Sequence, residues 1–124
     1  MGVLSVHHVQ LPYRPAQAKA VRHFYGVLLG LTEISHPSSD SPRYAAGTQK
    51  IDLLPFDPPQ PLSPQAHIAF EVLNLPELRH ALLNAGLPLD EVRPLAGHRR
   101  FYVYDPAGNR LEFIEPEPTG VWTV

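Results

Sequence analysis

Residues 50–54 read KIDLL, and residues 110–114 read RLEFI. The two stretches match position for position as basic, apolar, acidic, apolar, apolar. Each has the alternation of a β-strand, in which successive side chains point to opposite faces of a sheet. The acidic residue, Asp52 or Glu112, therefore points away from its apolar neighbours, which we expect to pack beneath a helix. A chemically equivalent strand thus occurs towards the end of each half of the chain.

Further polar residues recur at nearly the same spacing, which indicates an internal repeat. Asp52 and Glu112 are 60 positions apart, and His8 and His67 are 59 apart. Independent surface residues have no reason to recur at matched offsets. The sequence therefore predicts an α+β fold in which two βαβββ modules follow in tandem. We expect pseudo-twofold symmetry between the modules and curved mixed sheets that enclose a cavity.

Hydrophobic periodicity predicts a strand, a helix and three further strands in each half. In the first half these elements are expected at 3–11, 15–29, 31–36, 43–46 and 49–56. In the second half they are expected at 66–72, 75–85, 91–95, 99–104 and 110–115. Asn74 and Glu77 resemble a capping box at the start of the second helix, and Gly30 and Gly86 are natural helix ends.

The predicted elements and the proline content define the domain organisation. The chain contains 15 prolines, several of them close together between the two halves. Proline blocks both helices and central strands, so this stretch is interpreted as a linker. We therefore expect one domain over 1–124, made of a first module (1–56), a Pro-rich linker (57–65) and a second module (66–117).

Composition excludes several classes of protein. The chain has 124 residues, enough for one compact domain, and 44% of them are hydrophobic. Its formal charge of −2 argues against nucleic acid or an anionic membrane as a partner, because both attract basic surfaces. It contains no cysteine, so any metal must be held by nitrogen and oxygen. There is no basic leader and no apolar run long enough to span a membrane, so we expect a cytoplasmic protein.

Four polar side chains are predicted to share the helix-free faces of the two sheets. They are His8, Asp52, His67 and Glu112. Two imidazoles with one or two carboxylates suit a divalent metal such as Zn, Mn, Fe, Ni or Co. The alternative interpretation is that they are ordinary solvated residues on the open face of an antiparallel sheet.

Polar and aromatic side chains alternate with apolar ones along the predicted strand 99–104. Those on the face of Glu112 are expected to line the cavity and to contact a substrate. The predicted substrate-binding residues are Arg100, Tyr102, Tyr104 and, on the neighbouring strand, Arg110. Ordinary sheet packing is the alternative role for the two tyrosines.

Several stretches together resemble the vicinal oxygen chelate superfamily, which contains glyoxalase I, fosfomycin-modifying transferases, bleomycin-resistance proteins and extradiol dioxygenases. The matching stretches are 8–11 (HVQL), 24–31 (FYGVLLGL), 67–70 (HIAF) and 101–113 (FYVYDPAGNRLEF). The last is the most specific, and together they cover nearly the whole chain. The first and last of these stretches also resemble a small glyoxalase-like group of this superfamily.

The resemblance implies a metal site and a mechanism. It places the metal histidines at His8 and His67 and the metal glutamate at Glu112. Asp52 falls where glyoxalase I has a fourth ligand, a glutamate that is one methylene longer, whereas the fosfomycin enzymes have no acid there. The metal would act as a Lewis acid on adjacent substrate oxygens, and Glu112 would be the catalytic base. Residues 12–15 (PYRP) depart from the turn of many members, which leaves the substrate class open.

The resemblance also implies candidate functions and an assembly. The leading hypothesis is a metal-dependent lyase, isomerase or thiol transferase that acts on a small oxygen-rich substrate. A metal-free protein that binds a drug or metabolite, as bleomycin-resistance proteins do, is the alternative, and an extradiol dioxygenase is a third. Members of this size commonly form homodimers. We therefore expect a homodimer whose site takes His8 from one chain and His67 and Glu112 from the other.

Overall fold

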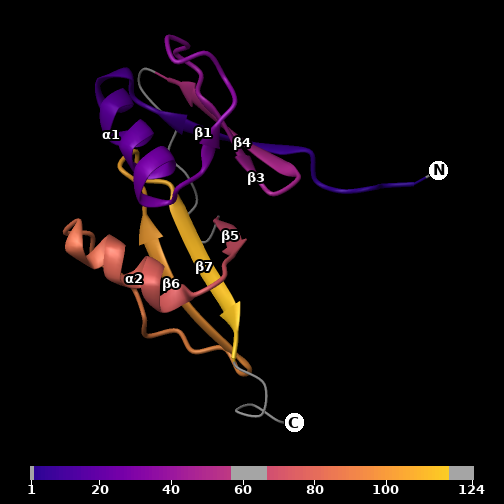
Figure 1. The fold of residues 1–124 in the computed structure, drawn as a ribbon, viewed down its shortest axis with the longest axis vertical. Helices are drawn as coiled ribbons and strands as arrows, with labels where there is room; N and C mark the ends of the chain where they lie inside the picture. Colours follow the sequence, from indigo (N-terminus) through magenta and orange to yellow (C-terminus); the bar gives the residue numbers. More distant parts are fainter. Residues whose placement is uncertain (1, 57–66, 118–124) are drawn as a thin grey trace. The chain divides into compact units, whose positions relative to one another are not determined.

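The computed structural model describes residues 2–56 and 67–117. The chain divides into two compact units, residues 1–61 with 106–109 and residues 62–105 with 110–124. Each unit combines helical structure with a small β-sheet (Figure 1), which confirms the α+β class. The predicted linker 57–65 lies outside the described residues, and the module boundaries and the symmetry between modules stay predictions. No helix in the described part of the chain is long and apolar enough to cross a membrane.

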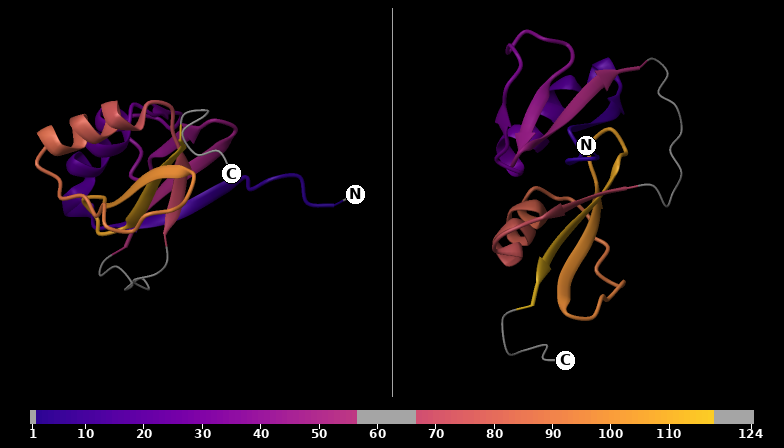
Figure 2. Two further views of the ribbon diagram at one scale, coloured as in Figure 1. Left: turned by 90° about the horizontal axis from the view of Figure 1, so that it is seen from below. Right: turned by 90° about the vertical axis from the view of Figure 1, so that its right-hand side faces the viewer.

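The first unit contains a four-stranded mixed sheet in the order β1-β4-β3-β2. Its strands are β1 (His8–Tyr13), β2 (Thr32–Glu33), β3 (Arg43–Ala46) and β4 (Gln49–Pro55). Strand β1 runs parallel to β4, whereas β3 is antiparallel to both of its neighbours. Strand β1 begins five residues later than expected. Val3 and Leu4 lie outside the sheet, and both residues are almost fully exposed. The segment before β1 extends away from that strand (Figures 1 and 2).

The predicted helix 15–29 is one continuous helical segment with three kinds of turn. A 3₁₀ turn (Pro15–Gln17) leads into α1 (Ala18–Arg22) and then into a π-helical turn (His23–Leu28). The segment ends where expected, because Gly30 has a φ of 70°, a conformation that glycine adopts without strain.

The helical segment covers the face of the first sheet that carries Ile51. The ring of Tyr25 stacks on that of Tyr44 at 5.8 Å, and Tyr44 lies opposite Ile51 on the neighbouring strand. All three side chains are buried. Asp52 therefore points to the other face of β4, where Arg43 lies opposite it. The prediction from strand alternation is confirmed for this residue.

The second unit contains a three-stranded sheet in the order β5-β7-β6. Its strands are β5 (Ile68–Glu71), β6 (His98–Tyr104) and β7 (Arg110–Pro116). Strand β5 runs parallel to β7, and β6 is antiparallel to β7. The predicted strand 91–95 is wrong, since only isolated bridges occur there, at Asp90 and Leu95. The side chain of Asp90 accepts a hydrogen bond from the N–H of Val92, which favours a turn over an extended strand.

Helix α2 (Leu75–Asn84) lies across one face of this sheet (Figures 1 and 2). Leu82 of the helix is fully buried. On the sheet, the ring of Phe113 stacks on Phe70 at 5.3 Å and lies 5.6 Å from Phe101. This apolar layer occupies one face of β7, so Glu112 points to the opposite face, as the alternation predicted.

The start of α2 is fixed by two carboxylates. The predicted capping box is confirmed in one half, because the side chain of Asn74 accepts from the N–H of Glu77. The other half is wrong, since the N–H of Asn74 donates to Glu115, and the carboxylate of Glu77 accepts from the side chain of Asn74 instead. Glu115 of β7 accepts from the N–H groups of Leu75 and Asn74 and from Arg99. These donors, the N–H of Leu75 first among them, lower the pKa of Glu115. The positive end of the helix dipole stabilises the negative charge of Glu115, and these hydrogen bonds join α2 to the sheet.

Candidate functional site

Glu112 is a buried carboxylate of the second unit. It lies within β7, between Ala69 of β5 and Tyr102 of β6, and only 4% of it is exposed. Its two oxygens have different partners. Oε1 is 2.9 Å from Nε2 of His67, and Oε2 is 3.2 Å from Nη1 of Arg100. The second unit therefore brings together two of the predicted metal-binding residues, with an arginine on the far oxygen.

Arg100 is held at both ends of its guanidinium. Besides the contact with Glu112, its Nε donates to the backbone carbonyl of Arg93 at 2.9 Å. An arginine fixed in this way restrains Glu112 and keeps Oε1 turned towards His67. The sequence predicted substrate contact for Arg100. The structure shows it bound to Glu112, and its contact with a substrate stays a prediction.

Asp52 of the first unit is equally buried, with 6% exposed, but its surroundings differ. Both of its oxygens accept from Arg43, whose Nε and Nη2 lie 2.6 and 2.7 Å away. These hydrogen bonds lower the pKa of Asp52. Arg43 was not identified from the sequence as the partner of Asp52, although the hairpin between β3 and β4 implies this pairing. A turn that pairs Ala46 with Gln49 necessarily pairs Arg43 with Asp52 three residues further out.

The Arg43–Asp52 pair leads to a prediction about stability. We expect Asp52→Asn to lower the free energy of unfolding at pH 7 by about 1.5–3 kcal/mol, the scale for a hydrogen bond to a charged group. Because folding lowers the pKa of Asp52, the pair stabilises fully above its ordinary value of 3.8, and this stabilisation is lost as the pH falls below it. Urea unfolding at pH 7 and pH 3 measures the difference.

The exposed Asp40 of the same unit provides the control, and Asp40→Asn should leave the free energy of unfolding nearly unchanged. A loss in the free energy of unfolding of Asp52→Asn that is the same at both pH values would contradict the ion pair.

Since Arg43 donates to both oxygens of Asp52, the same variant is also expected to keep the metal content of the unsubstituted protein.

His8 is the first residue of β1 and is exposed. Its Nδ1 lies 3.0 Å from Nδ1 of His7, and it lies opposite Lys50 of β4. His8 and Asp52 belong to the first unit, whereas His67 and Glu112 belong to the second, so the convergence of the four stays a prediction. Within residues 2–56 and 67–117, no three His, Cys, Asp or Glu side chains are grouped so as to hold a metal.

The donor chemistry nevertheless fits a divalent ion at His67 and Glu112. Imidazole nitrogen and carboxylate oxygen bind such ions at about 2.0–2.2 Å. Two ligand atoms 2.9 Å apart, as Nε2 and Oε1 are, can therefore bind the same ion. The pair would need a third donor, and His8 is the residue that the sequence supplies for it.

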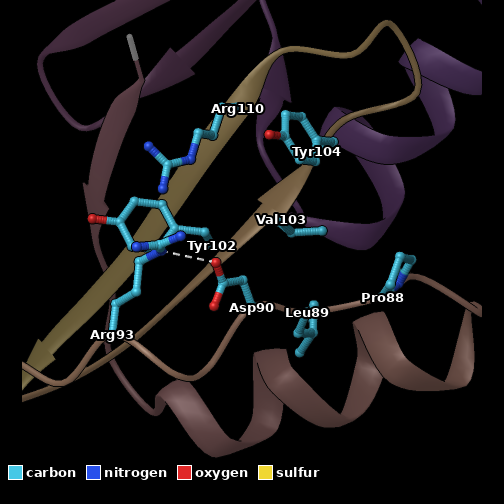
Figure 3. Close-up of a pocket in the computed structure, with 8 residues that line it drawn as sticks. All are labelled: Pro88, Leu89, Asp90, Arg93, Tyr102, Val103, Tyr104 and Arg110. Carbon is cyan, nitrogen blue, oxygen red and sulfur yellow. Dashed lines mark hydrogen bonds and ion pairs between the residues drawn. The ribbon is translucent and has the colours of Figure 1, made fainter. Parts of the chain in front are cut away.

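The second unit also contains a pocket of about 470 Å³ (Figure 3). It is bounded by the loop 88–93 on one side and by the strand residues 102–104 and Arg110 on the other. Three of the four predicted substrate-binding residues line it, namely Tyr102, Tyr104 and Arg110. Sequence reasoning missed the contribution of the loop, because it assigned part of it to a strand.

Tyr102 joins the pocket to the His67–Glu112 pair. Its ring and that of His67 form a T-shaped contact, with centroids 5.3 Å apart and planes at 83°. The guanidinium carbon of Arg110 lies 4.0 Å from the centroid of the same ring, within the range of a cation–π contact.

Comparisons with known proteins agree with this architecture. The family model of the Glyoxalase/Bleomycin resistance protein/Dioxygenase superfamily matches residues 5–113. A protein from Bacillus anthracis described as a glyoxalase family member is 30% identical, with a TM-score of 0.80 over 94% of this chain and 98% of the other. A search of curated proteins found no significant match.

Two more distant structures share the fold. Lactoylglutathione lyase from Agrobacterium tumefaciens is 21% identical, with a TM-score of 0.71 over 94% of this chain and 96% of the other. An antibiotic-binding protein from a Streptomyces species is 15% identical, with a TM-score of 0.75 over 94% and 99%. The family match over most of the sequence and the agreement in fold lead to one conclusion: the chain belongs to the Glyoxalase/Bleomycin resistance protein/Dioxygenase superfamily.

Proposed function

We propose that this protein is a metal-dependent enzyme of the glyoxalase type, which carries out lyase, isomerase or thiol-transfer chemistry on a small oxygen-rich substrate. The metal ligands in this proposal are His8, His67 and Glu112. The observation that supports it is the buried carboxylate of Glu112, whose Oε1 lies 2.9 Å from Nε2 of His67. A buried carboxylate beside an imidazole, with a pocket lined by the neighbouring Tyr102, is an arrangement that suits catalysis.

Each residue of the second unit has a defined task in this proposal. The divalent metal, when bound, polarises the substrate oxygens as a Lewis acid. Glu112 would leave the metal and take a proton at Oε1 from the carbon beside the substrate carbonyl, because Arg100 holds Oε2, and it would then return the proton to the product. Tyr102 supports the imidazole of His67 through the edge contact of their rings and forms the wall along which the substrate lies. A screen of 2-oxoaldehyde–thiol adducts, epoxides and catechols with metal-loaded protein tests the function.

The second candidate is a metal-free protein that binds a small molecule. One observation favours it, namely that the buried carboxylates of Asp52 and Glu112 are each paired with an arginine of the same unit, Arg43 and Arg100 respectively. Such pairs balance the buried charges without a metal. Tight binding of a ligand that is never transformed and is indifferent to chelator would favour this function. Ring cleavage of a catechol in the screen would instead favour a dioxygenase.

The proposed assembly is a homodimer in which each site takes His8 from one chain and His67 and Glu112 from the other. A small chain of this superfamily that exposes the edges of its sheets can pair the backbone groups of those edges by associating with a second copy. Sedimentation should then give a dimer at micromolar concentration. A monomer that still binds metal would contradict the shared site.

Mixing variants tests the shared site directly. Neither His8→Ala nor Glu112→Ala should bind metal as a pure homodimer. After the two proteins are mixed and allowed to exchange chains, each mixed dimer contains one complete site and one site without both residues. Metal binding should therefore reappear only in the mixture. If each site came from a single chain, the mixture would bind no more metal than its components.

A further inference from the structure

His7 is a polar residue beside a proposed metal ligand, and the proposed function gives it no task. It comes one residue before β1, so the alternation of that strand does not set its direction, and it is exposed. Its backbone is nevertheless anchored to the sheet, because its carbonyl accepts from the N–H of Lys50 at 3.1 Å. His7 is therefore held at the start of the first sheet, next to His8.

The rings of His7 and His8 are in contact through the same atom of each ring. Nδ1 of His7 lies 3.0 Å from Nδ1 of His8, within hydrogen-bond distance. The ring centroids are 5.2 Å apart and the planes are at 86°, so the rings are nearly perpendicular and do not stack. A hydrogen bond between two neutral imidazoles requires that one nitrogen carries the proton and the other accepts it. The contact therefore couples the tautomer of His8 to that of His7.

The tautomer of His8 decides which of its nitrogens can bind a metal. A neutral imidazole carries one proton, and only the unprotonated nitrogen can be a ligand. If Nδ1 of His8 donates to His7, Nε2 of His8 is left as the ligand atom. If Nε2 carried the proton instead, Nδ1 would have to bind the metal, and His7 already lies against Nδ1. In the second unit, Nε2 is likewise the nitrogen of His67 that faces Glu112.

A histidine that binds a metal usually donates its other ring N–H to a carboxylate, a carbonyl or water. Asp52 is near enough for such a role. The hydrogen bonds from Arg43 are the main cause of the low pKa of Asp52, and the charges of His8 and His7 add to the effect. Both oxygens of Asp52, however, already accept from Arg43. The partner that the structure gives to Nδ1 of His8 is the imidazole of His7.

We infer that His7 is a positioning residue of the metal site: its Nδ1 accepts a hydrogen bond from Nδ1 of His8 and holds that imidazole in the tautomer that presents Nε2 to the metal. This inference rests on the proposed function, in which His8 is a ligand. The hydrogen bond itself forms before any metal binds, so it can be measured in the metal-free protein. His7 touches neither metal nor substrate in this role.

The first test determines the tautomer of His8. The full chain is kept metal-free with chelator at about pH 8, where an ordinary imidazole is neutral, and long-range ¹H–¹⁵N spectra of the histidine rings show which nitrogen carries the proton. We expect the proton of His8 on Nδ1. In His7→Ala it should move to Nε2, the position that free histidine prefers. His7→Asn should keep it on Nδ1, because Oδ1 of asparagine takes the place of Nδ1 as acceptor.

The second test measures metal affinity by calorimetric titration with Zn²⁺. His7→Ala should weaken binding by about 10–100-fold, the usual effect of removing a residue that orients a metal ligand. His7→Asn should restore most of the affinity, which a general disturbance of the strand end would not allow. His36→Ala is the matched control, because His36 is an exposed histidine of the same unit whose Nδ1 also has a local partner, Ser38. It should bind Zn²⁺ as the unsubstituted protein does.

Three results would overturn the inference. They are a proton on Nε2 of His8 in the unsubstituted protein, unchanged Zn²⁺ affinity in His7→Ala, and equal loss of affinity in His7→Ala and His7→Asn. Its failure can be distinguished from failure of the proposed function. Zn²⁺ binding that is lost in His67→Ala but unchanged in His7→Ala would remove the positioning role alone. A protein that binds no metal at all would remove the proposed function, and with it the role of the His7–His8 contact in a metal site.

Discussion

Glu112→Gln is expected to reduce turnover of any substrate found in the screen by about 100-fold or more. The reason is that Glu112 both binds the metal and moves the proton in the proposed function, and loss of a general base alone has this scale. Glutamine keeps the size of the side chain and can still accept a hydrogen bond from Arg100, so the fold and the pocket should persist. Steady-state kinetics on metal-loaded protein gives kcat and KM separately.

The matched control is Glu71→Gln, because Glu71 is an exposed glutamate on β5 of the same sheet. It should leave kcat unchanged. Binding of the substrate or of an unreactive analogue to Glu112→Gln should weaken much less than turnover. If Glu112→Gln retained full kcat, Glu112 would not be the base. A protein that only binds its ligand would show no turnover, and its affinity for the ligand would not change in Glu112→Gln.

His67→Ala is expected to abolish stoichiometric binding of a divalent metal. In the structure, Nε2 of His67 lies 2.9 Å from Oε1 of Glu112, and alanine leaves this carboxylate without its imidazole partner. A site that has lost one of three protein ligands cannot hold the ion at micromolar concentration. Titration calorimetry with Zn²⁺ and Mn²⁺, together with metal analysis of protein purified without chelator, measures the loss.

His80→Ala provides the control for this substitution. His80 is an exposed histidine of α2 in the same unit, and its Nε2 contacts Asn84 of the same helix. It should bind metal as the unsubstituted protein does. Full metal occupancy in His67→Ala, with His80→Ala unchanged, would contradict the assignment of His67 and would direct attention to the metal-free alternative.

Local periodicity determined much of this protein. The alternation of KIDLL and RLEFI correctly places Asp52 and Glu112 on the faces away from the helices, because the side-chain direction in a strand is set by the backbone alone. The capping of α2 by Asn74 was also predictable, since it involves residues three positions apart. The family followed from motifs that extend over nearly the whole chain, and the match over residues 5–113 confirms it.

Contacts between distant residues were decided only by the tertiary structure. The loop 88–93 was mistaken for part of a strand, because its turn depends on a side-chain contact of Asp90 and on backbone pairing with Tyr102. Arg43 and Arg100 were not recognised as partners of the buried carboxylates. Long arginine side chains have many rotamers, and only strand register and neighbouring carbonyls select one of them. Periodicity therefore determined which face each carboxylate occupies, whereas tertiary packing decided which cation each of them meets.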